Sequence, residues 1–167
     1  MKQSARERST KIVIRVGVVT NSDDRVPSIL SSLGLKVCSL RHGMRSYDVN
    51  SASKGEELSD IDFVVLSYDV SFEKPSREIF DAAKDLGRLG EMQADQERYI
   101  HVGDDLEKDL EGAVQAGWEG LFLDREGNHA TGKLAIAEIS ISSLLGLANR
   151  IQQERSSQVP ENQAVED

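Results

Sequence analysis

The sequence has a single cysteine, Cys38, which excludes an internal disulfide and a zinc site built from cysteines. It also has no apolar run near the roughly 18 residues that a membrane-spanning helix needs. The first residues, MKQSARERST, lack the apolar core of a signal peptide. We therefore expect no membrane association and a reducing setting, either cytoplasmic or nuclear.

Clustered positive charge is scarce as well. The formal net charge is −9, and basic residues such as Lys11, Arg15 and Arg25 are scattered. Nucleic-acid binding draws its affinity from clustered Lys and Arg side chains that release counterions from phosphate. The charge pattern therefore argues against a nucleic-acid partner.

The sequence does have the length and apolar content of one globular domain. Its 167 residues are 38% hydrophobic and 29% charged. We expect the domain at 11–154, a flexible leader at 1–10 and a disordered tail at 155–167, because both ends are polar. The stretch at 36–61 is polar and has no clear period, which indicates an insertion.

Short β-rich runs alternate with helical patterns along the domain. The predicted strands are KIVIRVGVVT, IDFVVLS, RYIHVGDD and GLFLD, and the first has the nearly continuous apolar character of a strand covered on both faces. The predicted helices lie in RVPSILSSLGL, after Pro75, in LEKDLEGAVQAG and in ISSLLGLANRIQQE. This alternation predicts an α/β fold of right-handed βαβ units on a parallel sheet.

Polar side chains follow the first three predicted strands. In chain order they are Thr20, Asn21, Lys74, Asp104, Asp105 and Asp109. In an open α/β sheet, ligands bind outside the carboxyl ends of the strands. A hydroxyl, a lysine and carboxylates at that edge suit a phosphoryl group with a hard cation, because Mg²⁺ prefers oxygen ligands and takes only one or two protein carboxylates. Asp104 fits the role of direct ligand, and the Lys74 ammonium could neutralise phosphoryl oxygens.

Each candidate also has a purely structural interpretation. Asp105 and Asp109 could cap and charge the first turn of a helix. Thr20 could be an ordinary strand-end hydroxyl and Lys74 a solvated loop lysine. His101 lies inside an apolar run, so we expect a packing histidine without a chemical role. Only the ordered set, one polar group at each strand end, favours a site.

Three stretches carry a family resemblance: VGVVTNSD, EKPSREIF and HVGDDLEKDLEGAVQAGWEGLFLDR. In this order they resemble the second, third and fourth motifs of the haloacid dehalogenase (HAD) superfamily. In style they are closest to its HAD-like hydrolase domain-containing proteins. The resemblance implies a three-layer Rossmann-like fold and Mg²⁺ dependence. It also implies a phosphatase that acts on phosphorylated small molecules through an aspartyl-phosphate.

The resemblance also implies a role for each candidate residue. The implied metal site comprises Asp104, Asp105 and Asp109. Thr20 would bind the transferring phosphoryl group, with Asn21 beside it, and Lys74 would offset charge between nucleophile and phosphoryl group. Asp109 would support the metal shell or orient Lys74. Asp105 occupies a position where the family often has a small polar residue.

The family's first motif, two aspartates separated by one residue, is missing from its expected place. It supplies the nucleophile and the general acid/base, and it should precede the strand that ends at Thr20. None of the first 22 residues is Asp. Asp60 and Asp62 precede their strand, which puts them at the wrong edge of the sheet. We therefore expect a C-terminal part of a hydrolase, inactive alone and holding Mg²⁺ weakly or not at all.

The missing segment has structural consequences. In this superfamily the first-motif strand is central, between the strands that end at Thr20 and Asp104, and the cap domain follows the first motif. The chain is therefore expected to have an incomplete sheet and no cap, through a truncated gene model, an alternative product or a degenerate paralogue. Self-association through the incomplete sheet is then plausible.

Two other functions remain open. One is a non-catalytic HAD-like binding module, a pseudoenzyme. The other is a phosphoacceptor receiver domain, which ranks last because its first strand should end in an acidic pair and here it ends in Thr20.

Overall fold

The computed structural model describes residues 13–43, 59–88, 97–127 and 139–157. The predicted leader lies outside these ranges, as does the predicted tail beyond residue 157. The chain divides into two compact units, each described by itself. The first comprises Met1–Ser71 and Ala82–Gly90, and the second comprises Phe72–Asp81 and Glu91–Asp167.

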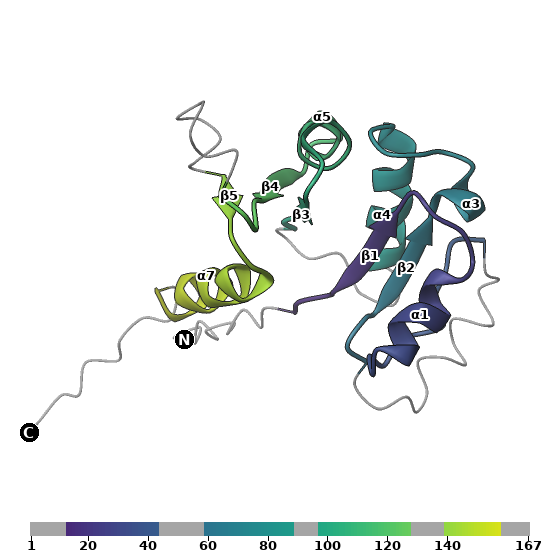
Figure 1. The fold of residues 1–167 in the computed structure, drawn as a ribbon, viewed down its shortest axis with the longest axis horizontal. Coiled ribbons are helices and arrows are strands. Elements are labelled where there is room, and N and C mark those ends of the chain that lie inside the picture. Colours follow the sequence, from purple (N-terminus) through teal and green to yellow (C-terminus); the bar gives the residue numbers. More distant parts are fainter. Residues whose placement is uncertain (1–12, 44–58, 89–96, 128–138, 158–167) are drawn as a thin grey trace, which may run out of the picture. The chain divides into compact units, whose positions relative to one another are not determined.

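The first unit contains a two-stranded parallel sheet (Figure 1). β1 (Gly17–Thr20) pairs with β2 (Phe63–Leu66), so that Gly17 lies opposite Phe63 and Thr20 opposite Leu66. All four residues of β2 are buried, as its continuous apolar run predicts. Gly17 allows the Phe63 ring to pack against the strand, because a Cβ at this position would lie 2.2 Å from the ring.

β1 is shorter and more exposed than predicted. The regular strand begins at Gly17, and the apolar side chains of Val13, Ile14 and Val16 before it are 55%, 46% and 47% exposed. The prediction of a strand covered on both faces is wrong for this segment. Apolar character alone does not bury a strand, and β1 has only β2 as a neighbour among the described strands.

α1 (Val26–Ser32) forms where the helical spacing predicts it. The chain turns at Gly34, whose φ of +89° favours glycine. No residue of the helix is buried, and Ile29 and Leu33 are 54% and 73% exposed. The apolar face of α1 is therefore only partly covered within the described part of the first unit, where Val26 and Leu30 are half-buried.

The ends of the predicted insertion at 36–61 run alongside β2. Parallel bridges join Val37 to Ile61 and Arg41 to Val64. The Arg41 guanidinium also pairs with the Asp69 carboxylate of α3 (Ser67–Val70) at 2.8 Å. Isolated bridges therefore tie the described ends of the insertion to the first unit, and its middle, 44–58, lies outside the described residues.

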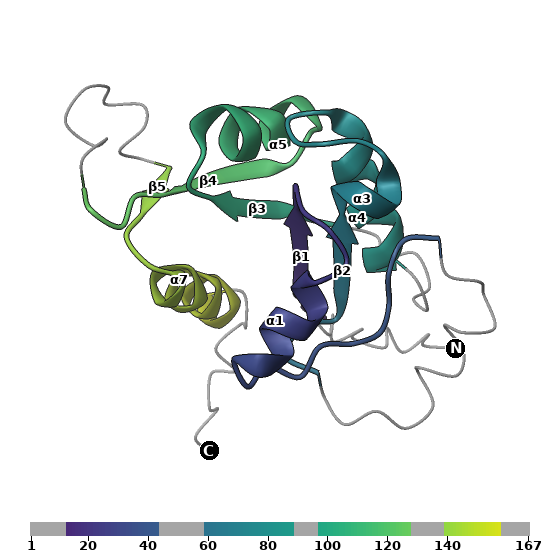
Figure 2. The same cartoon turned by 45° about the vertical axis from the view of Figure 1, so that its right-hand side comes forward.

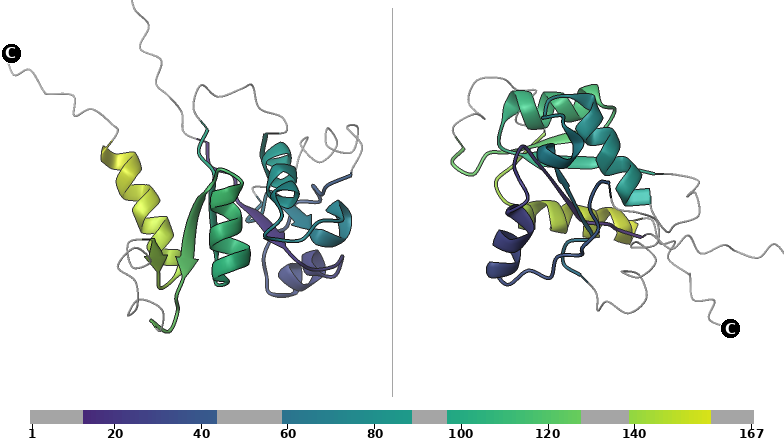
Figure 3. Two further views of the ribbon diagram at one scale, coloured as in Figure 1. Left: turned by 90° about the horizontal axis from the view of Figure 1, so that it is seen from above. Right: turned by 90° about the vertical axis from the view of Figure 1, so that its right-hand side faces the viewer.

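The second unit contains a three-stranded parallel sheet in the order β3 (Ile100–Gly103), β4 (Glu119–Leu123), β5 (Ser140–Ile141) (Figure 2). A continuous helical segment, η1 (Leu106–Glu111) and α5 (Gly112–Gln115), lies on one face of this sheet, and α7 (Leu144–Ser157) lies on the other (Figure 3). The sequence predicts Ile141 in the last helix, which is wrong, because a strand of two residues is too short to leave a periodic pattern. α7 continues past the predicted end at Glu154.

α4 (Arg77–Arg88) begins close to Pro75, as predicted. Its predicted apolar face is buried: Ile79, Phe80, Ala83 and Leu86. Residues 77–81 of the helix belong to the second unit and residues 82–88 to the first.

The predicted α/β class with parallel strands is confirmed. The described strands form separate sheets of two and three strands, which agrees with the expected incomplete sheet. None of the described helices has the length and apolar character needed to cross a membrane.

Candidate functional site

The acidic cluster of the second unit lies where β3 runs into η1. η1 is a turn of π-helix, in which the backbone N–H groups of Asp109 and Leu110 both donate to the Asp105 carbonyl, at 2.9 and 3.2 Å. π-helical turns are wider than α-helical ones and are frequent at functional sites. Here the Asp109 side chain returns toward the start of the turn, and its Oδ2 accepts from the Asp105 N–H at 3.1 Å.

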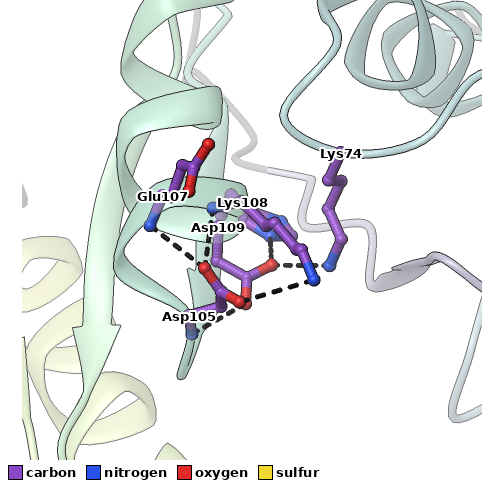
Figure 4. A network of polar contacts seen from close by, with 6 residues as sticks. Lys74, Asp105, Glu107, Lys108 and Asp109 are labelled. Atoms are coloured by element: carbon purple, nitrogen blue, oxygen red, sulfur yellow. Dashed lines mark hydrogen bonds and ion pairs between the residues drawn. The ribbon is translucent and has the colours of Figure 1, made fainter.

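Asp105 caps this helical segment. Its Oδ1 accepts from the backbone N–H groups of Glu107 and Lys108 at 3.1 and 2.9 Å (Figure 4). These two donors would otherwise lack partners in the first turn, and a carboxylate there is also favoured by the helix dipole. The structural interpretation of Asp105 therefore accounts for one of its two carboxylate oxygens.

Asp109 forms a buried ion pair with Lys74 (Figure 4). The Lys74 Nζ lies 2.5 Å from Asp109 Oδ1, and the two side chains are only 12% and 7% exposed. His101 reaches the same oxygen, with its Nε2 at 2.9 Å. The Asp109 carboxylate is thus held by a lysine ammonium, an imidazole and a backbone N–H.

These contacts decide the charge of Asp109. Burial by itself raises the pKa of a carboxyl, because it disfavours the ionised form. The hydrogen bonds from His101 and Lys74, together with the Lys74 charge, outweigh burial and hold the pKa of Asp109 well below its usual range. Asp109 is therefore a carboxylate at neutral pH.

Two glycines provide the space for this cluster. A Cβ at Gly103 would lie 2.1 Å from the Asp109 Cγ, so a larger residue would displace the carboxylate from the end of β3. A Cβ at Gly112 would lie 2.9 Å from the Pro75 Cα, so the helix and the loop that carries Lys74 approach closely only with glycine there. The absence of a side chain at both positions lets Lys74 and Asp109 approach within the distance of a hydrogen-bonded ion pair.

Asp104 is the exposed member of the cluster. No group of three or more His, Cys, Asp or Glu side chains within the described ranges is arranged to hold a metal ion. Mg²⁺ usually takes only one or two protein carboxylates and fills its other positions with water and phosphate oxygens. An exposed carboxylate at the end of β3 fits one such position.

Thr20 and Asn21 lie in the first unit, half-buried at the end of β1. Their convergence with Lys74 and Asp104 remains a prediction. Asp62 lies at the opposite end of the β1–β2 pair, where its Oδ2 accepts from the Val16 N–H at 2.7 Å. This position agrees with the inference that the aspartates before β2 are on the wrong edge for a nucleophile.

The polar contact of His101 is the feature that sequence reasoning missed. The histidine is buried at 8% exposure and packs its ring edge-on against Phe80, so the prediction of a packing residue is confirmed. Its contact with Asp109 had one detectable signal. His101 and Gly103 are two residues apart on a strand and therefore share a face, and a glycine there leaves room for a side chain from the following helix.

Comparisons with known proteins identify relatives of this chain. A protein family described as HAD-hydrolase-like matches residues 71–141, a range that contains Lys74 and all three aspartates but neither Thr20 nor Asn21. An uncharacterized hydrolase of Schizosaccharomyces pombe is 34% identical over 114 residues, which are 68% of this chain. An uncharacterized protein of Saccharomyces cerevisiae is 30% identical over 122 residues, again 68% of this chain.

A solved structure supports the fold. The HAD phosphatase from Thermococcus onnurineus matches 82% of this chain and 50% of its own, with a TM-score of 0.53 and 22% identity. The chain spans 40% of the fission-yeast protein and 33% of the budding-yeast protein. It therefore corresponds to less than half the length of these two relatives.

Replacing Asp109 with Asn tests the ion pair. The variant removes the carboxylate charge from a buried ion pair, so we expect a loss of about 3 kcal/mol in the free energy of unfolding at pH 7. The pKa of Asp109 is lower in the folded protein than in the unfolded chain, where it is about 3.9. The ionised carboxylate therefore stabilises the folded protein at pH values above about 3.9, and this stabilisation is lost as the pH falls below that value. The difference in the free energy of unfolding between the variant and the wild type should therefore become smaller below about pH 4.

Urea unfolding across pH measures this dependence, and Asp105→Asn is the matched control. An asparagine at that position still caps the helix, so its effect should stay within about 1 kcal/mol at every pH. A loss in Asp109→Asn that is no greater than in the control would show that the ion pair contributes little.

Proposed function

Because the chain belongs to the HAD-like hydrolase superfamily, we propose that it carries the lysine and the metal-binding aspartate of a Mg²⁺-dependent phosphatase site for phosphorylated small molecules. The observation that carries this proposal is the buried Lys74–Asp109 pair at the end of β3, next to the exposed Asp104. Asp109 holds the lysine ammonium in place. A fixed cation of this kind neutralises phosphoryl oxygens, which is the main work of phosphoryl transfer.

The remaining residues have complementary roles in this proposal. Asp104 holds Mg²⁺, which when bound neutralises charge on the phosphoryl oxygens. Asp105 caps the helical segment and so fixes the backbone next to Asp104. In this proposal the capping residue therefore directly follows the residue that binds the metal ion. Thr20 and Asn21 keep the phosphoryl-binding role that the family resemblance implies.

We further propose that the chain is inactive when isolated. An aspartyl-phosphate route needs a carboxylate nucleophile beside the phosphoryl site. The Asp62 carboxylate lies at the far end of β2 and bonds to the backbone of Val16. The partial coverage of the relatives supports the proposal that residues 11–154 are part of a larger HAD-like domain. An insertion at 36–61 is a further part of this proposal.

Purified chain should therefore not hydrolyse p-nitrophenyl phosphate above background with or without Mg²⁺, because the covalent route is missing. Release of p-nitrophenol measures this directly. Asp104→Asn and the exposed control Glu111→Gln make the assay specific. Mg²⁺-dependent turnover that Asp104→Asn abolishes and Glu111→Gln retains would refute the proposed inactivity and assign activity to this site.

A second candidate function is a non-catalytic module that associates through its incomplete sheet. The observation in its favour is the group of exposed apolar side chains in the first unit, Val13, Ile14, Val16, Ile29 and Leu33. Exposed apolar side chains beside a strand with one neighbour among the described strands are features of surfaces that accept another strand. The occupant in this proposal is a second copy of the chain.

Size-exclusion chromatography with light scattering, from dilute to concentrated samples, tests the association. We expect a concentration-dependent dimer that Ile14→Lys shifts toward monomer, since a charge beside the strand opposes pairing. Leu145→Lys, at a residue 69% exposed on α7 of the second unit, should leave the equilibrium unchanged. A wild-type chain that stays monomeric at the highest concentration would exclude this candidate.

A further inference from the structure

We propose that His101 is a positioning residue, which fixes the Asp109 carboxylate and through it the Lys74 ammonium. The inference deepens the proposed function and rests on it, since Lys74 is the cation of the proposed phosphoryl site. His101 itself touches no substrate in this proposal. Its effect passes entirely through Asp109.

The contacts of the Asp109 carboxylate define this role. His101 Nε2 and Lys74 Nζ converge on Oδ1, at 2.9 and 2.5 Å, while the Asp105 N–H donates to Oδ2. The three donors come from β3, from the loop before α4 and from the start of η1. A carboxylate held at both oxygens from three segments cannot rotate freely. Of these three donors, only Lys74 would still contact Oδ1 if the imidazole were removed.

The proton on the imidazole follows from the charge of its partner. An ionised carboxylate only accepts hydrogen bonds, so the ring nitrogen that faces Asp109 must carry a hydrogen. His101 Nε2 is therefore the donor.

Packing does not account for this contact. The His101 ring meets Phe80 edge-on, with centroids 5.2 Å apart and an interplanar angle of 89°, and an apolar side chain could fill the same space. The neighbouring Gly103 provides a separate argument, because any Cβ there would overlap Asp109. The strand is thus shaped to admit the Asp109 carboxylate next to the imidazole.

Two substitutions separate hydrogen bonding from packing. His101→Gln keeps an N–H donor at about the distance of Nε2, whereas His101→Leu keeps an apolar side chain of similar volume without a donor. A residue that only packs should tolerate leucine at least as well as glutamine. A residue that positions Asp109 should tolerate replacement by glutamine but not by leucine.

The readout is the Lys74 ammonium in the 167-residue chain. Its ¹H–¹⁵N NMR signal is assigned as the signal that is lost in Lys74→Met. The rate at which the ammonium protons exchange with water then reports how firmly the ammonium is held. We expect wild type and His101→Gln to exchange at similar rates. His101→Leu should exchange about tenfold faster, the factor of one hydrogen bond to a charged group.

The outcomes decide the inference separately from the proposed function. Unchanged exchange in His101→Leu, or equal acceleration in His101→Gln, would overturn the positioning role. Titration with inorganic phosphate in the presence of Mg²⁺ then tests the site, where His101→Leu should bind about tenfold more weakly than His101→Gln. If the exchange pattern is found but no variant binds phosphate, the role of His101 stands and the proposed function fails.

A measurement on the wild type applies even if His101→Leu does not fold. Long-range ¹H–¹⁵N correlation distinguishes the two ring nitrogens of His101 and shows which one is protonated. The proposal requires a protonated Nε2. A bare Nε2 would leave no donor toward Asp109 and would overturn it.

Discussion

The buried ion pair between Lys74 and Asp109 is the interaction on which the proposed site depends. It joins the loop before α4 to the π-helical turn after β3, with both side chains almost withdrawn from water. Charges at this depth are tolerated only when they are paired and hydrogen-bonded. The pair therefore restricts its neighbours: Gly103 and Gly112 must lack side chains, and His101 must offer a donor.

The requirement that a buried charge be paired also distinguishes the three aspartates that lie close together at the end of β3. They are not equivalent, because each carboxylate has a different environment. Asp105 faces the open N–H groups of the helix start, Asp109 faces a lysine in the interior, and Asp104 faces solvent. Two of the three charges thus have partners within the second unit, and the third is the one that our proposal assigns to a cation.

Most of the fold could be predicted because its signals are local. The apolar run of β2 and the buried face of α4 follow from periodicity, and the turn after α5 follows from Gly117, whose φ is +82°. The exposure of β1 could not be predicted, because an apolar run does not report what covers it. The Lys74–Asp109 contact joins residues 35 positions apart, and the site residues were found through motif order rather than through this contact. The His101–Asp109 contact was missed although it joins residues only eight positions apart, because the sequence pattern does not show that the Asp109 side chain turns back toward β3.

A double-mutant cycle between Lys74 and Asp109 tests the central claim most directly. Lys74→Met, Asp109→Asn and the double variant are compared with the wild type by urea unfolding at neutral pH. The account predicts that the double variant is more stable than the sum of the two single losses implies, with a coupling of about 2 kcal/mol, because each single change strands a buried charge. Losses that add to within about 0.5 kcal/mol would contradict it, since they would mean that the two side chains do not depend on each other.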